Sequence, residues 1–437
     1  MNYNKYRSLS NYRVIPRLVR VGVEQTVTVY PLGVSKRFDD ETEYTVSFVP
    51  MEIYDADRFS LATEWDSVTV KPIDGALRFS YVFEEEQEWT ISITAQTDQE
   101  KKVKPIEVHI YSLEEDLYSL NPYMGDLHVH SCRSDGQEDP AIVAANYRKE
   151  GYDFFALTDH HKRLPSDDMI RTYAEVPLGI KLFHGEEVHV PNGWIHIVNF
   201  GGAYSVNDLY HNDPETITAK VEAEAAQMQT PKGVNTLEFA WRKWCTEQIR
   251  QSGGLSIVAH PHWHWLQTYH MSSAMLDYVF ETGTYDAFEL AGGLPTHYDN
   301  LQVAFYDEQR AKGRVIPIVG SSDSHGTDPA VFFGLGKTIV FSKDLELSSI
   351  CDAVKNGYSV AIEQQKNESE RVYGTYRMVK YARFLLDQYF PAHNELCVEE
   401  GILMREYALG DAAAGVRLGE LATRTEQHMR KILRAEE

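Results

Sequence analysis

Histidines and carboxylates recur in short groups in the middle of this chain. All but three of its 17 histidines lie between His128 and His325, a window of less than half of the 437 residues. The groups, in chain order, are Asp126-x-His128-x-His130, Asp159-His160, Glu187, His260-Pro261 and Asp323-x-His325. Neutral imidazoles mixed with carboxylates suit zinc, manganese or iron, whereas sets of oxygen ligands alone suit calcium or magnesium. The groups therefore predict a site for divalent transition-metal ions.

These groups lie at the ends of segments that have the composition of β-strands. The segments are GDLHVH from Gly125, FFALT from Phe154, IKLFHGEEV from Ile180, IHIVNF from Ile195, LSIVAH from Leu255, DAFEL from Asp286 and VIPIVG from Val315. Helical stretches such as Pro140–Lys149 and Leu301–Lys312 alternate with them, which predicts a parallel, barrel-like sheet covered by helices. In a barrel the C-terminal strand ends converge on one mouth, so residues distant in sequence meet there. A single histidine in such a place is usually a structural residue, but the joint pattern has almost no structural explanation.

Two flanking regions have different patterns. Residues 1–116 contain short segments rich in Val, Ile, Thr, Tyr and Phe, which predict an antiparallel, immunoglobulin-like β-sandwich. Residues 117–365 form the predicted barrel domain, with a helical insertion at about 205–252. Residues 366–437 are helical and charged, and this segment either packs on the barrel or mediates self-association as a homo-oligomer.

Charge and cysteine usage limit the partners. The formal net charge of −23 repels phosphate backbones and anionic lipids, which argues against nucleic-acid and membrane-surface binding but not against a small phosphate ester held by cations. The N-terminus has no apolar signal-peptide region, and no run of about 18 apolar residues could cross a membrane. The four cysteines are too widely spaced for a disulfide framework or a thiolate zinc site. These features predict a cytoplasmic protein that acts on a small molecule.

The same groups of residues resemble a known family. The segments GDLHVHSCRSDG, LTDHH, HGEEV, AHP and GSSDSH occur in the order of the motifs of the PHP (polymerase and histidinol phosphatase) family, over roughly residues 120 to 365. Within the family, GEEVHV and HIVNFGG are similar to the branch of carbamate hydrolases. The resemblance implies a distorted seven-stranded β/α barrel that holds two or three divalent metal ions, which would be Zn, Mn or Fe.

By this resemblance the ligands divide into three sets. His128, His130 and Asp323 would bind the first ion, Asp135, His160 and His325 the second, and His196 and His260 the third, with Glu187 bridging the third ion to the first. Glu186 adjoins Glu187 and could replace it. His196 is preferred to His189 because HIVNF follows the usual strand pattern, and Asp135 stands where some relatives have His.

Other residues near the ligands have supporting roles. Asp126 and Asp159 would accept the second ring N–H of a ligand histidine and fix its tautomer, although Asp126 could equally satisfy local backbone. His161, Arg133 and Lys162 are candidates to contact the substrate anion, and His161 is also a candidate general acid. For Lys162 a solvated surface position is the simpler interpretation.

The family most often hydrolyses phosphate esters, so the resemblance predicts a phosphoesterase for small mono- or diesters. Water held between two metal ions loses a proton near neutral pH, and the resulting hydroxide attacks phosphorus. One alternative is a carboxyl-ester or carbamate hydrolase in which the same ions polarise the carbonyl group. Another is a non-catalytic metal-binding or interaction protein that acts through its sandwich, which is disfavoured because every ligand position is filled. The acidic charge argues against a polymerase-associated exonuclease.

Overall fold

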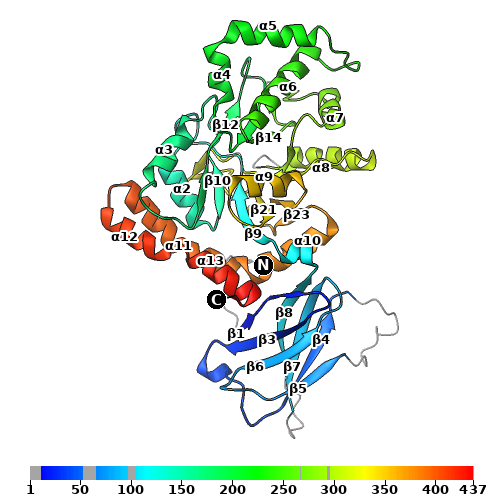
Figure 1. Cartoon of the computed structure of the whole chain (residues 1–437), viewed down its shortest axis with the longest axis vertical. Helices are drawn as coiled ribbons and strands as arrows, with labels where there is room; N and C mark the ends of the chain where they lie inside the picture. The colour runs from blue at the N-terminus through cyan, green and yellow to red at the C-terminus, as the bar shows by residue number, and fades with distance from the viewer. Residues whose placement is uncertain (1–10, 53–64, 97–103, 266, 293–295, 437) are drawn as a thin grey trace.

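The two ends of the molecule have different architectures. The computed structural model describes residues 11–52, 65–96, 104–265, 267–292 and 296–436, so residues 1–10 of the predicted sandwich lie outside the described part. Figure 1 shows the N-terminal strands at one end of the molecule and a mixed α/β region at the other, with the C-terminal helices between them.

The N-terminal region consists of two sheets. One has the order β1 (Tyr12–Ile15), β3 (Glu24–Pro31), β6 (Leu77–Val82), and the other has the order β2 (Leu18–Arg20), β8 (Ile106–Leu113), β7 (Glu88–Ala95), β4 (Tyr44–Pro50), β5 (Ser67–Val70). Alternate residues of both sheets enter one apolar cluster, in which Phe48 of β4 contacts Phe79 of β6 at a ring distance of 5.6 Å. Strands β3 to β8 are rich in the Val, Ile, Thr, Tyr and Phe residues from which strands were predicted in this region. The immunoglobulin-like topology stays a prediction.

The α/β region also contains two sheets rather than one continuous ladder. The first has the order β11 (Lys181–Phe183), β10 (Phe154–Ala156), β9 (Asn121–Asp126), β21 (Gly336–Ser342), β22 (Ser359–Glu363), β23 (Arg371–Tyr373). The second has the order β12 (Gly185–Val188), β13 (Ile197–Phe200), β14 (Leu255–Val258), β17 (Ala287–Ala291), β18 (Ile318–Gly320). Isolated bridges between His160 and Glu187 and between Val129 and Ser324 connect them. The closed seven-stranded barrel therefore stays a prediction.

The strand directions correct the predicted parallel sheet. The β9–β10–β11 and β14–β17–β18 pairings are parallel, as predicted, but β21 pairs antiparallel with both β9 and β22, and β13 pairs antiparallel with both β12 and β14. The segment IKLFHGEEV was expected to form one strand, yet it divides at His184 into β11 and β12, which belong to different sheets. A side chain at Gly185 would lie 2.7 Å from the carbonyl oxygen of Leu157, so a glycine is required where the chain crosses from one sheet to the other.

Helices cover the sheets and extend them. In the predicted insertion lie α4 (Val206–Asn212), α5 (Pro214–Ala225) and α6 (Thr236–Gln251), at the far end of the molecule in Figure 1. The other helices are α1 (Glu115–Tyr118), α2 (Pro140–Lys149), α3 (Leu164–Thr172), α7 (Ser273–Thr282), α8 (Thr296–Ala311), α9 (Leu347–Lys355), α10 (Tyr376–Gln388), α11 (Phe390–Ala408), α12 (Ala412–Leu421) and α13 (Arg424–Met429). Two small hairpins, β15–β16 (His264–Trp265 and Thr268–Tyr269) and β19–β20 (Gly326–Thr327 and Ala330–Val331), follow β14 and β18. Among the described residues no helix is long and apolar enough to cross a membrane.

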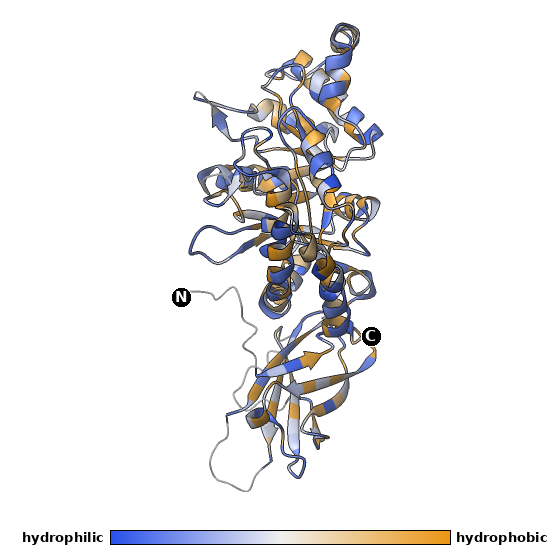
Figure 2. Ribbon diagram, turned by 90° about the vertical axis from the view of Figure 1, so that its left-hand side faces the viewer, coloured by the Kyte–Doolittle hydropathy of each residue, from blue (hydrophilic) through white to orange (hydrophobic). Residues whose placement is uncertain are grey.

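The C-terminal helices pack on the α/β region. Figure 2 shows hydrophobic residues along these helices, and Phe384, Phe390 and Leu403 belong to the same buried apolar cluster as residues of β9, β10 and β21. Between α2 and α11 lies an ion pair, in which Arg148 Nε donates to Glu400 Oε2 at 2.7 Å, and both residues are at most 1% exposed. Arg148 also lies 3.6 Å from Asp153 and donates to the hydroxyl of Thr425. The C-terminal segment is thus held to the α/β region by a buried charge network.

We expect Glu400→Ala to lower the free energy of unfolding by about 3 kcal/mol, because it leaves the buried guanidinium of Arg148 undercompensated. This value is at the lower end of the usual range for breaking a buried ion pair, because the Asp153 carboxylate remains 3.6 Å from Arg148. Glu399→Ala is the matched control: Glu399 is 48% exposed and pairs with Arg417 and Arg424, so its loss should cost less than about 1 kcal/mol. Urea unfolding measures both, and equal losses would contradict a structural role for the buried pair.

Candidate metal centre

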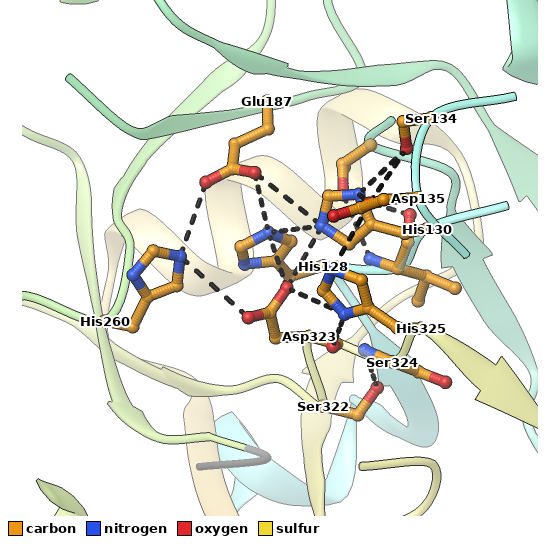
Figure 3. A network of polar contacts seen from close by, with 12 residues as sticks. His128, His130, Ser134, Asp135, Glu187, His260, Ser322, Asp323, Ser324 and His325 are labelled. Atoms are coloured by element: carbon orange, nitrogen blue, oxygen red, sulfur yellow. Dashed lines mark hydrogen bonds and ion pairs between the residues drawn. The ribbon is translucent and has the colours of Figure 1, made fainter. Parts of the chain in front are cut away.

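The predicted ligands meet at the junction of the two sheets, most of them just outside the strands and Glu187 within β12. His128 and His130 were expected within a strand, but β9 ends at Asp126, and the bridge from Val129 to Ser324 keeps the following residues extended. His128 and His130 therefore still point to one side, and each is at most 1% exposed. Figure 3 shows their rings directed toward Glu187 and Asp323.

The first set of side chains surrounds one point. The Nε2 atoms of His128 and His130 are 3.2 Å apart, and they lie 3.2 Å and 3.0 Å from Asp323 Oδ1. Each Nε2 atom is also 3.6 Å from Glu187 Oε2. Two imidazole nitrogens facing each other across carboxylate oxygens form a donor set that matches a transition-metal ion.

The second set lies on the other side of His130. Asp135 contacts His160 Nε2 and His325 Nε2, both at 3.3 Å. His130, Asp135, His160 and His325 each offer one ligand atom, and these four atoms lie within 4.8 Å of one another. Asp135 and the two outer rings are the more exposed members, since the Asp135 side chain is 53% exposed.

The third set is centred on Glu187. Its Oε1 atom lies 2.7 Å from His196 Nδ1 and 3.3 Å from His260 Nε2. Its Oε2 atom lies 2.7 Å from His160 Nδ1 and 3.4 Å from His189 Nε2. Both His196 and His189 therefore reach Glu187, and the structure brings together more histidines than the sequence assigned.

The two candidate glutamates have different environments. The Glu187 carboxylate faces the histidines, whereas Glu186 accepts hydrogen bonds from Ser205 Oγ, Asn207 Nδ2 and the backbone N–H of Val206 at the start of α4. Side chains of neighbouring strand residues point to opposite faces, so one of the two had to face away from the histidines.

The residues present fit divalent metal ions. Glu187 Oε2 and Asp323 Oδ1 are buried, and neither accepts a hydrogen bond of good geometry from the described residues. Burying a carboxylate oxygen without a hydrogen bond costs folding free energy. Five overlapping groups of three or four His, Asp and Glu residues could each hold an ion, and Glu187 belongs to three of them. Mixed nitrogen and oxygen donors with an unsatisfied negative charge are what zinc, manganese or iron would satisfy.

The electrostatics of the site favour bound positive charge. Burial alone would raise the pKa of Glu187, but His196, His160 and His128 lower it well below its ordinary value. Burial alone would lower the pKa of His160, but Glu187 and Asp135 raise it to about 10. The carboxylates thus stay ionised and draw protons or cations to the centre.

Two ligand positions have left-handed backbone. The φ angle is 27° at His260 and 50° at Asp323, a region that non-glycine residues seldom adopt. Such conformations cost about 1–3 kcal/mol each and persist where the surroundings determine them, often at functional sites. After β14 and β18 end, the His260 side chain lies toward Glu187 and the Asp323 side chain lies toward His128 and His130.

The aspartates expected to support the ligands have other partners. Asp126 accepts from the backbone N–H of Ser322 and from the Tyr147 hydroxyl. Asp159 accepts from Ser131 and Ser134, which fixes the loop before Asp135. These hydrogen bonds do not involve a histidine ring, so neither residue has the tautomer-fixing contact that the sequence suggested.

Glu289 was not predicted from the sequence, and His196 was preferred to His189 as a metal ligand. Glu289 Oε2 lies 3.0 Å from His128 Nδ1, and both side chains are fully buried. A lone glutamate within the apolar strand DAFEL was the available signal, because a buried carboxylate needs a partner. His189 lies 2.8 Å from His160 Nδ1, in a group with Glu187.

The predicted substrate contacts lie in one of two cavities beside the centre. A cavity of about 410 Å³ is lined by Arg133, Ser134, His160, His161, Lys162, His189, Gly193 and His196. Arg133 lies 3.6 Å from Asp168, and Lys162 donates to the Arg133 carbonyl oxygen, so their charges are partly engaged. Burial, with His189 and His160 nearby, lowers the pKa of His161 to about 4, so its ring is neutral near pH 7 and is not in the imidazolium form that a general acid would use. The roles proposed for these three residues stay predictions.

The second cavity has an aromatic wall. It measures about 390 Å³ and is lined by Asp135, His160, His196, His260, Trp263, Asp323, His325, Val331 and Phe332. Trp263 follows β14 and lies 5.7 Å, ring to ring, from both His196 and His260. His160 and His196 line both cavities, so the centre opens toward a basic side and an aromatic side.

Comparisons with known proteins give loose likenesses. No family model and no curated protein matches the chain. Solved structures that resemble it include a two-domain protein from Bacteroides vulgatus containing a predicted PHP-like metal-dependent phosphoesterase (18% identity, TM-score 0.40, 56% of this chain and 65% of that one). Another is an inferred metal-dependent phosphoesterase from Bifidobacterium adolescentis (18% identity, TM-score 0.33, 46% of this chain and 87% of that one). A third is an amidohydrolase from Chromobacterium violaceum with bound sulfate (19% identity, TM-score 0.32, 47% of this chain and 89% of that one). Every TM-score is below 0.5, which is too low to assign a function or the carbamate-hydrolase branch.

We expect Glu187→Gln to lower the amount of metal bound per chain, because it removes a charge that faces six histidines. The adjacent Glu186→Gln should retain wild-type metal content, since Glu186 points to α4. Elemental analysis after reconstitution with Zn²⁺ or Mn²⁺ and dialysis measures the difference. Equal metal content in the two variants would show that Glu187 has no special role.

Proposed function

We propose that this protein is a metal-dependent hydrolase of the PHP type that cleaves small phosphate mono- or diesters. The observation that supports this most directly is the position of Glu187, whose two carboxylate oxygens contact histidines of all three predicted ligand sets. A carboxylate shared in this way is suited to hold neighbouring cations close together, as two-metal hydrolase sites require.

The chain's own residues supply the frame for such chemistry. Divalent ions, when bound, lower the pKa of water and neutralise charge on the oxygens of an ester. The histidines present nitrogen lone pairs to the centre, and the hydrogen bonds of Asp159 to Ser131 and Ser134 hold the loop that places Asp135. The burial of His128, His130 and Glu187 excludes water from the inner side, where a low dielectric strengthens electrostatic attraction.

The shape of the centre supports an ester with two unlike ends. On the basic side, Arg133 and Lys162 line the cavity into which an anionic group would project. In the second cavity, Trp263 and Phe332 offer apolar area to the organic group. A phosphate between them would have its charge neutralised by the metal ions. Carboxyl esters and carbamates could use the same ions, and they are the alternative that the assay must separate.

We expect reconstituted enzyme to release product from a chromogenic phosphate monoester or diester, and to turn over the matching carboxyl ester and aryl carbamate more slowly. Enzyme stripped with EDTA and the double variant His128→Ala/His130→Ala should be inactive, because both lack the inner ions. Turnover confined to the ester or carbamate would move the substrate class to carbonyl chemistry. No metal-dependent turnover of any of the four would refute the proposed activity.

We expect Trp263→Ala to lower kcat/KM for 4-nitrophenyl phosphate by about 10-fold, mainly through KM, since an aromatic contact contributes about 0.5–1.5 kcal/mol and 1.4 kcal/mol is tenfold. Trp194→Ala is the control, because its indole is 41% exposed and does not line the aromatic cavity. Metal content must be the same in both variants. If the two variants have equal KM values, Trp263 does not contact the aryl group.

A further inference from the structure

Glu289 is an ionisable residue in an otherwise apolar, fully buried strand. Every residue of β17 (Ala287–Ala291) is buried, and the Glu289 side chain is 0% exposed. Placing a carboxylate in such surroundings costs several kcal/mol unless it is paired. Its Oε2 atom lies 3.0 Å from His128 Nδ1.

The other nitrogen of His128 faces the candidate metal centre. His128 Nε2 lies 3.2 Å from both His130 Nε2 and Asp323 Oδ1. A neutral imidazole has one N–H and one lone pair, so a lone pair on Nε2 requires the proton to be on Nδ1. An acceptor at Nδ1 selects that tautomer, holds the ring plane and makes Nε2 more basic.

The second oxygen of Glu289 belongs to a small buried polar group behind the centre. Glu289 Oε1 and Asp299 Oδ2 are buried and have no hydrogen-bond partner among the described residues. Asp299 Oδ1 accepts from the backbone N–H of Gly292, and a Cβ placed at Gly292 would lie 3.2 Å from Glu289 Oε1 and 3.8 Å from Asp299 Oδ1. Burial, together with the nearby carboxylates of Glu363 and Glu289, raises the pKa of Asp299 to about 8.

The strand that presents Glu289 is itself fixed by a side chain. Gln302 of α8 donates from Nε2 to the carbonyl oxygens of Glu289 and Leu290, at 3.2 Å and 3.1 Å. These bonds satisfy backbone acceptors at the end of β17, where the pairing with β18 shifts its register. Backbone and carboxylate of Glu289 are therefore both held.

We infer that Glu289 is a positioning residue for the metal centre, which holds His128 in the tautomer and orientation that direct Nε2 toward the ion. The inference rests on the proposed metal centre but not on its substrate. The competing explanation is that Glu289 only stabilises the fold. The two explanations differ in what they predict for metal affinity in a folded protein.

The test measures Zn²⁺ affinity of the metal-free full chain by competition with a chromophoric chelator. Glu289→Leu removes the acceptor at nearly constant volume and should weaken affinity by about 10–100-fold, the usual effect of losing such a partner. Glu289→Gln keeps an acceptor oxygen and should recover part of that loss. The visible spectrum of the Co²⁺-loaded variants should also change, since the ring orientation alters the ligand field.

Glu363→Gln is the matched control. Glu363 is 1% exposed and lies in the neighbouring strand β22, but its partners are Tyr373, Arg371 and Gln365 rather than a ligand histidine. It should lose stability without losing Zn²⁺ affinity. Thermal unfolding identifies any variant that does not fold, and if Glu289→Leu fails, Glu289→Gln must still bind Zn²⁺ more weakly than Glu363→Gln.

Wild-type affinity and an unchanged Co²⁺ spectrum in folded Glu289 variants would overturn the inference. A wild-type protein that binds no Zn²⁺ would instead overturn the metal centre on which the proposed function depends. If wild type binds Zn²⁺ and hydrolyses phosphate esters while the Glu289 variants bind Zn²⁺ equally well, the proposed function stands and Glu289 is structural.

Discussion

The crowding of imidazoles and carboxylates around Glu187 is the constraint on which the rest of the structure depends. A buried carboxylate is stable only if charges or hydrogen-bond donors surround it, and Glu187 is 0% exposed with six histidines in contact. Those histidines come from several loops that are far apart in sequence, so the backbone must bring them to one point. The two sheets meet where it does so, through the bridge between His160 and Glu187.

Several local features are explained by this requirement. The chain divides at His184 so that β12 can leave the first sheet and join the second, and Gly185 has no side chain to obstruct the crossing. His260 and Asp323 adopt left-handed backbone where straight continuation would turn them away. Behind the ligands, Glu289 reaches His128 from β17, and the ion pair of Arg148 with Glu400 fastens the C-terminal helices to α2. These scaffold contacts thus contribute stability that offsets the free-energy cost of burying the charged residues of the centre.

In the proposed hydrolase, reaction type and substrate choice would be determined by different parts of the molecule. The buried histidines and carboxylates determine what can be bound and activated, and they would serve phosphate and carbonyl esters alike. The walls differ: Arg133 and Lys162 lie toward one cavity, and Trp263 and Phe332 toward the other. These wall residues come from loops, which can vary without disturbing the ligands.

Much of the candidate site could be predicted from the sequence, because its signals are local. The helix Pro140–Lys149 was located correctly from its composition, since a helix depends on neighbours three and four residues away, and most strands were located from alternation. The motifs also place their ligands within or at the ends of predicted strands, so His128, His160 and Asp323 could be assigned to one site before their distances were known. What the sequence could not determine depends on partners that are distant along the chain. Tertiary structure decided the antiparallel pairing of β13 and β21, the direction of the Glu186 side chain toward α4, and the contact of Glu289 with His128. A hydrogen bond across 161 residues leaves no periodic trace in sequence, so only the folded chain shows which carboxylate supports which ring.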